Sequence, residues 1–209
     1  HNLSLIKLIN NTSTAMGKRL LKERLTHPVK DSKEILRRLA LSKELYDYHA
    51  PIENELANIY DIERLTRRIK LNRLHPFELN YLYDSLLSIK EVVTFMENYK
   101  FITPPCSSSD LSLFIQSIDS TFDLSVSGKY MLKDVEVNMI SEGINTQIDE
   151  LNTQNDILYS KLELLRNHIL SYVKSDDVNY VGINRLDKEG FFLTLTKNRF
   201  NLIKQEIMT

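Results

Sequence analysis

Apolar residues in the first half of the chain recur every three or four positions, which is the spacing of one face of an α-helix. The pattern predicts four helices between residues 14 and 100 and favours no strand there. Capping and proline signals place their starts at residues 14–17, Asp31-Ser32, Pro51 and His75-Pro76. We therefore predict a compact helical core with five largely buried leucines, namely Leu20, Leu36, Leu39, Leu65 and Leu82.

The second half contains a longer apolar stripe. Between residues 144 and 172, apolar side chains alternate spacings of four and three over four heptads. This repeat of about 3.5 residues predicts a helix over about residues 145–174 whose stripe a partner helix must cover. The stripe consists of Ile144, Ile148, Leu151, Leu158, Leu162, Leu165, Ile169 and Tyr172, with Asn155 in the one polar place.

The pattern changes again after the long helix. Residues 178–186 and 190–196 read as two strands separated by a short polar turn, which predicts a β-hairpin. Only five Gly and five Pro occur in 209 residues, a composition that favours a mainly α protein. A hairpin at the end of a long helical arm suggests a protein that reaches for or grips another molecule.

Charge is distributed unevenly along the chain, although the net charge is only -1. Residues 1–73 carry fifteen Lys and Arg against nine Asp and Glu, a net of +6, so the remainder carries -7. Residues 183–204 are basic again, with a net of +3. The total excludes a uniformly basic nucleic-acid-binding protein but leaves room for a local basic patch around the hairpin.

Motifs for catalysis are missing from the sequence. The run Ser127-Gly128-Lys129-Tyr130 only superficially resembles a phosphate-binding loop, because Asp123 stands where the upstream glycine belongs and Tyr130 replaces the magnesium-binding hydroxyl. The five histidines are scattered and Cys106 lies in a Pro/Ser-rich loop, so neither a metal site nor an activated nucleophile is expected.

A run of charged residues follows the middle of the first half: Asp61, Glu63, Arg64, Arg67 and Arg68. Such a run could form a charged site, but charge runs usually solvate one helix face. We therefore predict a structural role for it.

The single cysteine cannot form an internal disulfide, which favours a reducing, intracellular compartment. No apolar run approaches the roughly 20 residues of a membrane span, so no membrane association is expected. Because the sequence begins with His1 and stops soon after a strand pattern, we expect a fragment of a longer protein.

One motif near the start is more specific than these patterns. Residues 4–21 read Ser-Leu-Ile-Lys-Leu-Ile-Asn-Asn-Thr-Ser-Thr-Ala-Met-Gly-Lys-Arg-Leu-Leu, and residues 28–31 read Pro-Val-Lys-Asp. This segment resembles the entry to the core domain of the MutS mismatch-repair family. The family pattern there is Ser-Leu, an apolar pair, Asp-x-Thr-x-Thr-x-Met-Gly-x-Arg-Leu-Leu, and Pro-apolar-x-Asp. Asn10 departs from it, since the family usually has Asp at that place.

Further segments resemble the same family in the expected order. Residues 61–65 are similar to its Asp-Leu-Glu-Arg segment, and residues 74–79 to its Arg-Pro-x-Leu step. Residues 142–151 resemble the start of its lever helix, and residues 189–196 its clamp strand. The order and spacing across nearly the whole chain make the resemblance specific. A tryptophan-free sequence rich in Lys, Asn and Ile suggests a divergent branch from an AT-rich genome.

The resemblance implies a mainly α fold in three parts: a helical core at residues 1–132, a coiled-coil-like lever helix at 133–174, and a partial β-hairpin clamp at 175–209. In the family, the clamp closes around double-stranded DNA, the levers transmit ATP-dependent changes, and the protein is a homo- or heterodimer. The stripe of the long helix would then face a returning lever helix beyond Thr209.

The resemblance also limits what the chain does alone. The family's mismatch-reading and ATPase domains are not in this sequence, so no catalytic residue and no cofactor or metal site is expected here. ATP and magnesium would bind in the ATPase domain of the parent protein, which would be a DNA-dependent ATPase.

The candidate DNA-binding residues are the basic and amide side chains around the hairpin: Arg185, Lys188, Lys197, Asn198 and Arg199. They would bind phosphates without reading sequence. The alternative is that these side chains are simply solvated on an exposed hairpin and do not bind DNA.

Two other functions stay open. One is a coiled-coil adaptor that binds a partner helix through the apolar stripe, although a simple adaptor needs neither a paired aromatic strand nor basic residues at its tip. The other is a MutS relative that acts in recombination or on branched DNA, which the sequence does not separate from mismatch repair.

Overall fold

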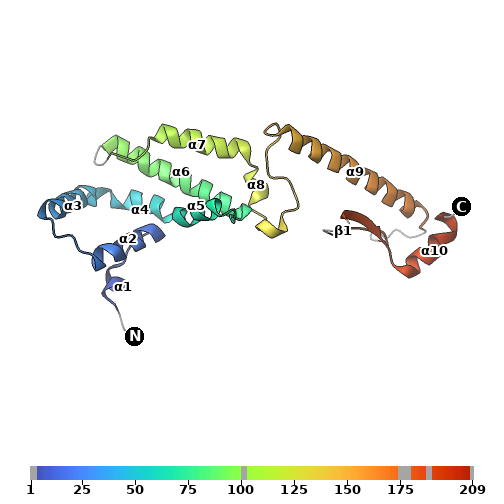
Figure 1. The fold of residues 1–209 in the computed structure, drawn as a ribbon, viewed down its shortest axis with the longest axis horizontal. Helices are drawn as coiled ribbons and strands as arrows, with labels where there is room; N and C mark the ends of the chain where they lie inside the picture. Colours follow the sequence, from blue (N-terminus) through green and yellow to red (C-terminus); the bar gives the residue numbers. More distant parts are fainter. Residues whose placement is uncertain (1–3, 100–102, 174–179, 187–189, 208–209) are drawn as a thin grey trace. The chain divides into compact units, whose positions relative to one another are not determined.

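The computed structural model describes residues 4–99, 103–173, 180–186 and 190–207, and it confirms the predicted mainly α fold with a small β-hairpin (Figure 1). The chain divides into two compact units, His1–Ser141 and Glu142–Thr209. The three-part division expected from the family resemblance stays a prediction.

The regular elements in the described part of the first unit are helices, and one isolated antiparallel β-bridge joins Phe122 to Ile140. The unit contains α1 (Leu5–Ile9), α2 (Ala15–Thr26), α3 (Ser32–Leu45), the 3-10 helix η1 (Tyr46–Tyr48), α4 (His49–Ala57), α5 (Ile62–Lys70), α6 (Pro76–Tyr99), α7 (Ser108–Thr121), α8 (Leu124–Ser127) and the 3-10 helix η2 (Leu132–Asp134). The second unit contains α9 (Thr146–Ser171), β1 (Gly182–Leu186), β2 (Gly190–Thr194) and α10 (Lys197–Ile207).

Side-chain caps begin the first helices where the sequence predicts them. The Thr14 hydroxyl accepts the Gly17 N–H of α2 at 2.9 Å, and Asp31 accepts the Lys33 N–H of α3 at 3.0 Å. Helix α2 ends at Thr26, directly before His27-Pro28, because proline disfavours a helical residue in front of it.

The third predicted helix is two helices. A short link separates α4 from α5, and Asp61 in that link caps α5 by accepting the Arg64 N–H at 3.2 Å. The link also contacts α6, because the Tyr60 N–H donates to the hydroxyl of the fully buried Ser85 at 3.0 Å. Helical spacing continues through this link in the sequence, so periodicity alone did not reveal the break.

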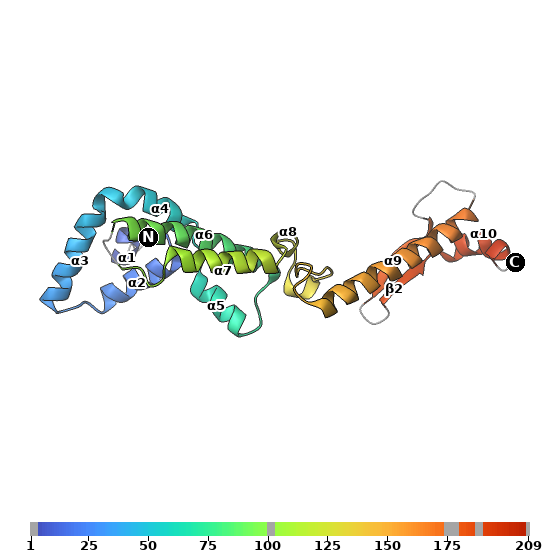
Figure 2. The same ribbon diagram turned by 90° about the horizontal axis from the view of Figure 1, so that it is seen from above.

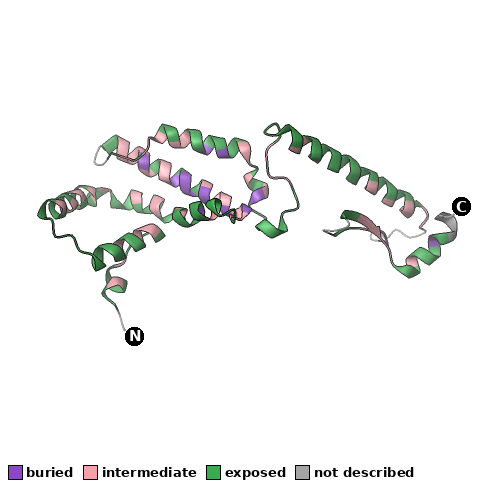
Figure 3. Cartoon of the chain, viewed as in Figure 1, coloured by how far each residue is buried: buried purple, intermediate pink, exposed green. Residues whose placement is uncertain are grey.

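Helix α6 is the centre of the first unit. Its Leu82 and Leu86 pack with Leu65 of α5 and with Ile115 and Ile118 of α7, and all five side chains are buried. Figures 1 and 2 show α7 alongside α6, and Figure 3 shows buried positions repeated along α6. The core therefore forms where several helices supply apolar faces to one long helix.

Three of the five leucines predicted to be buried are exposed. The exposed fractions are 45% for Leu20, 65% for Leu36 and 62% for Leu39, whereas Leu65 and Leu82 are buried. The prediction was wrong for α2 and α3 because helical spacing identifies the apolar face of a helix but not whether another element covers it. Figure 3 shows both helices as mostly exposed.

The second unit is built on α9 and the hairpin. The strands are antiparallel with Gly182 opposite Thr194 and Leu186 opposite Gly190. Tyr180, Val181 and Ile203 form its buried centre, and the half-buried residues packed against them come from the end of α9 and from β2 and its continuation: Ile169, Leu170, Val173, Leu193 and Leu195. The hairpin therefore packs on the last turns of α9.

Helix α10 was not predicted from the sequence. The Thr196 hydroxyl accepts the Arg199 N–H at 3.3 Å and caps it, and Ile203 anchors it with only 3% exposure. The signal was present as a threonine followed by Phe200 and Ile203 at helical spacing. The neighbouring strand pattern obscured it.

The apolar stripe of α9 is open over most of its length. Leu151, Leu158 and Leu165 are 64%, 63% and 54% exposed, whereas Ile169, near the end of the stripe, packs against the buried cluster beneath the hairpin. Within the described residues of this unit, no second helix covers the stripe.

Replacing Leu65 or Leu82 with Ala should lower the free energy of unfolding by about 2–5 kcal/mol, because each change leaves a cavity in the α5–α6–α7 core. Leu36→Ala and Leu39→Ala are matched controls that should change it by less than about 0.5 kcal/mol, since both side chains are exposed. Denaturant unfolding followed by circular dichroism measures the four values. Equal losses at all four positions would show that α3 is covered in solution.

The open stripe of α9 should make the chain self-associate at high concentration, because large uncovered apolar surfaces favour association. Leu158→Gln and Leu165→Gln should shift sedimentation toward the monomer. Leu164→Gln, which removes a leucine outside the stripe, is the control. A wild-type chain that sediments as a monomer at every concentration would contradict the prediction.

Candidate nucleic-acid interface

Arg185 lies on the exposed outer part of the hairpin. Its guanidinium carbon lies 5.5 Å from the ring centroid of Phe191, the residue opposite it on β2. Phe191 in turn meets Tyr159 of α9 edge-on, with ring centroids 5.5 Å apart. A cation over an aromatic face is held in place by the ring quadrupole. The aromatic pair therefore orients Arg185 while the residue stays accessible to solvent.

Lys197 and Asn198 occupy the first turn of α10, and both are exposed. A lysine is unusual there, because the helix dipole already places partial positive charge at this end. An anion close to the first turn would offset that repulsion, because the amino ends of helices favour negative charge. This end of α10 is thus suited to a phosphate group.

Arg199 is turned toward the interior of the unit. Its Nη1 donates to the Tyr180 carbonyl oxygen at 3.2 Å, and its guanidinium carbon lies 4.8 Å from the centroid of the Tyr180 ring. The Tyr180 hydroxyl donates back to the Arg199 carbonyl oxygen at 3.0 Å. The two residues therefore hold each other through three contacts.

Among the five predicted DNA-binding residues, Arg185, Lys197 and Asn198 are exposed on one small unit, and Arg199 is half-buried. Lys188 lies outside the described residues. All five stay predictions as phosphate ligands. Sequence reasoning did not separate Arg199 from its neighbours, because an unpredicted helix decides which way each side chain points.

The run that superficially resembles a phosphate loop has a structural role. The Ser127 hydroxyl is 1% exposed and donates to Asn80 Oδ1 at 2.6 Å, while Asn80 Nδ2 donates to the Leu124 carbonyl at 2.8 Å. A Cβ at Gly128 would come within 2.9 Å of that amide. These residues fasten α8 to α6 and do not fit a nucleotide phosphate.

The charged run at the start of α5 ties helices together. Arg19 of α2 donates to both oxygens of Asp61, at 2.7 and 2.8 Å, and to Glu63 at 2.5 Å. The hydrogen bonds from Arg19 hold the pKa of Asp61 below its ordinary value. Arg68 pairs with the buried carboxylate of Glu78 on α6. The predicted structural role of these residues agrees with this geometry.

The comparison with protein families decides what kind of chain carries these features. Residues 1–187 match the family of MutS domain III. The chain belongs to the MutS family.

Several curated MutS relatives align along nearly all of the chain. A putative DNA mismatch repair protein and mutS homolog of Acanthamoeba polyphaga mimivirus is 28% identical over 98% of this chain. The DNA mismatch repair protein MutS of Clostridium kluyveri is 28% identical over 97%, and that of Acholeplasma laidlawii is 30% identical over 98%. The chain spans only 19%, 23% and 24% of these relatives' lengths, respectively.

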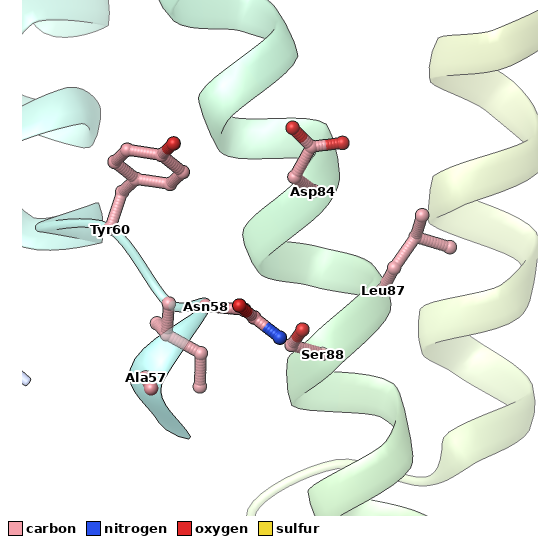
Figure 4. Close-up of a pocket in the computed structure, with 7 residues that line it drawn as sticks. Ala57, Asn58, Tyr60, Asp84, Leu87 and Ser88 are labelled. Carbon is pink, nitrogen blue, oxygen red and sulfur yellow. The ribbon is translucent and has the colours of Figure 1, made fainter. Parts of the chain in front are cut away.

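A hollow of about 490 Å³ lies in the first unit. Figure 4 shows Tyr60 on the link before α5 and Asp84, Leu87 and Ser88 on the neighbouring α6; all four line this hollow. It offers a single carboxylate, which supports neither acid–base catalysis by a carboxylate pair nor a metal site. Throughout the described part of the chain, no three His, Cys, Asp or Glu side chains gather as metal ligands would. None of the helices in that part is long and apolar enough to cross a membrane.

Asp61→Asn should weaken the attachment of α2 to α5, because Arg19 then keeps only the exposed Glu63 as a carboxylate partner among its described contacts. It should leave α5 capped, because Asn caps a helix nearly as well as Asp. Amide hydrogen exchange in α2 should therefore become faster at neutral pH. The control is Glu34→Gln, which removes a carboxylate that pairs with Arg37 and Arg38 inside α3.

The same attachment should depend on acid. A carboxyl whose folded pKa is lowered stabilises the fold above its unfolded pKa, and that stability is lost as pH falls through the folded value. Wild-type α2 should therefore exchange faster, relative to the intrinsic rate, only once pH falls below about 3.8, the ordinary Asp61 pKa. Protection of α2 unaffected by both Asp61→Asn and acid would show that apolar contacts hold it.

Proposed function

We propose that this chain is the core, lever and clamp part of a DNA mismatch-repair protein. Its second unit grips the backbone of double-stranded DNA without reading sequence. The observation that carries this proposal is that Arg185, Lys197 and Asn198 are all exposed on the hairpin and α10 of the second unit. The names of the MutS relatives support the repair role.

The chemistry of these side chains favours phosphate over base contacts. Lysine is a point charge on a flexible stem, and asparagine supplies an amide donor, so both suit phosphate oxygens. Arg185 lies on a two-stranded sheet with its guanidinium group over the ring of Phe191, so this side chain is held at the surface as a fixed positive charge. Binding of this kind depends on salt, because each neutralised phosphate releases counterions.

Helix α9 is suited to transmit movement. With 26 residues it is about 39 Å long at 1.5 Å per residue. The hairpin is fixed to its end by the buried Val181 and by Arg166 of α9, whose Nε donates to the Val181 carbonyl at 2.9 Å. A change of state in an ATPase domain elsewhere in the protein would reach the hairpin as a displacement of the whole helix. ATP hydrolysis would supply the energy there with magnesium as the bound cation, and no residue of this chain is assigned to either.

The open stripe of α9 supports a second candidate, an adaptor that binds a partner helix. A partner on the stripe and DNA on the hairpin are compatible, so only an adaptor without DNA binding competes with the proposal. A role on branched DNA or in recombination would use the same phosphate contacts. Competition between homoduplex, mismatched and branched DNA in the protein that carries this chain separates those roles.

Arg185→Ala and Lys197→Ala should each weaken binding to homoduplex DNA and make the plot of log affinity against log salt shallower by about one. Fluorescence anisotropy at several salt concentrations measures both quantities. Lys43→Ala, which removes an exposed cation of α3 in the first unit, should change neither. If Arg185→Ala and Lys197→Ala both keep the wild-type affinity and slope, neither residue belongs to the DNA contact surface, and the adaptor function is favoured.

A further inference from the structure

Helix α10 has two chemically different faces. Arg199 and Ile203, four residues apart, point into the unit, where Ile203 is 3% exposed and Arg199 holds Tyr180. Lys197, Asn201 and Lys204 follow the spacing i, i+4 and i+7, and all three are exposed. Residues at these spacings share one side of a helix. We call these three residues the outer stripe of α10.

The outer stripe has the composition of a backbone-binding surface. Residues 197–204 contain no Asp or Glu, so no carboxylate within that run opposes an anion. Lys197 and Lys204 are separated by about 10 Å along the helix axis, at 1.5 Å per residue. That length corresponds to roughly three nucleotides of one DNA strand, at 3.4 Å each. Asn201 lies between the two lysines and supplies an amide donor.

Arg199 has a different environment from these three residues. Its guanidinium group lies over the ring of Tyr180, a residue only 8% exposed, and donates to the carbonyl oxygen of the same residue. The Tyr180 hydroxyl donates to the backbone of α10 at Arg199. These contacts fix the first turn of α10 against the residues directly before β1. Arg199 is only two residues from Lys197, so the same contacts also position the start of the outer stripe.

We infer that α10 binds the DNA backbone through its outer stripe and that Arg199 is a positioning residue rather than a phosphate ligand. The inference rests on the proposed function, since it assigns the residues of the same surface. It adds Asn201 and Lys204 to the contact surface. It also excludes Arg199 from the contact surface and assigns it to positioning α10 through its contacts with Tyr180.

Variants of the outer stripe test the first half of the inference. Lys204→Ala should make the salt slope of homoduplex binding shallower by about one, as Lys197→Ala does. Asn201→Ala should weaken binding several-fold with an unchanged slope, because an amide releases no counterion. Lys43→Ala again serves as the charge control. Wild-type affinity and slope for Lys204→Ala would overturn the outer stripe.

Variants of Arg199 test the second half, and the informative background is the double variant Lys197→Ala/Lys204→Ala. If Arg199 is a phosphate ligand, adding Arg199→Met to this double variant should make the plot of log affinity against log salt shallower by about one more unit. A positioning residue acts through the stripe, so Arg199→Met should leave the slope unchanged in that background. It should weaken binding there by less than the several-fold loss expected in the otherwise wild-type chain, because only Asn201 of the stripe remains. A further loss of slope would overturn the inference.

Two milder changes address the case in which Arg199→Met destabilises the unit. Arg199→Lys keeps the charge but loses the planar stacking geometry, so it should weaken binding although lysine is itself a good phosphate ligand. Tyr180→Phe keeps the ring but removes the hydrogen bond to the α10 backbone, and it should weaken binding in the same direction. Thermal melting confirms that each variant is folded. Full affinity in both would contradict the positioning role.

The outcomes also separate this inference from the proposed function. If the wild-type chain shows no salt-dependent DNA binding, the proposed function fails and the inference fails with it. If the wild-type chain binds and Arg185→Ala lowers the slope while Lys204→Ala does not, only the inference fails.

Discussion

The second unit depends on one small apolar cluster. The cluster consists of Tyr180 and Val181, directly before β1, and Ile203 of α10. These side chains pack together against the end of α9. A two-stranded hairpin is marginally stable by itself, so this cluster gives the strands their stability. The directions of the exposed Lys197 and Lys204 follow from it, since Ile203 in the cluster fixes the rotation of α10. DNA binding by this unit would therefore depend on residues that never touch DNA.

The first unit shows a similar dependence on α6. The buried leucines of α6 pack against apolar residues of α5 and α7. Helix α2 is instead joined to the start of α5 by ion pairs of Arg19 with Asp61 and Glu63. Ion pairs between exposed residues contribute little net stability. The described ion pairs of α2 thus contribute less to the stability of the unit than the apolar contacts around α6.

Sequence patterns predicted the elements better than their contacts. Proline and capping residues gave the starts of α2, α3 and α6, because these signals act on the backbone within a few residues. The exposure of Leu36 and the burial of Leu65 were not distinguishable, since both sit on similar apolar faces and only the tertiary arrangement differs. The same limit applied to the candidate site. Charge counting found Lys197 and Arg199 together, but the contacts of Tyr180 separate them.

Ser85 shows how far a small residue can restrict a sequence. It is fully buried on α6, donates to the Tyr81 carbonyl at 2.6 Å and accepts the Tyr60 N–H at 3.0 Å. A larger side chain would push the link between α4 and α5 off the helix, and alanine would leave the Tyr60 N–H without its acceptor. Few residue types satisfy both the volume and the hydrogen bond. The break between α4 and α5, which the periodicity of the sequence hides, thus narrows the evolutionary choice at a position 25 residues away.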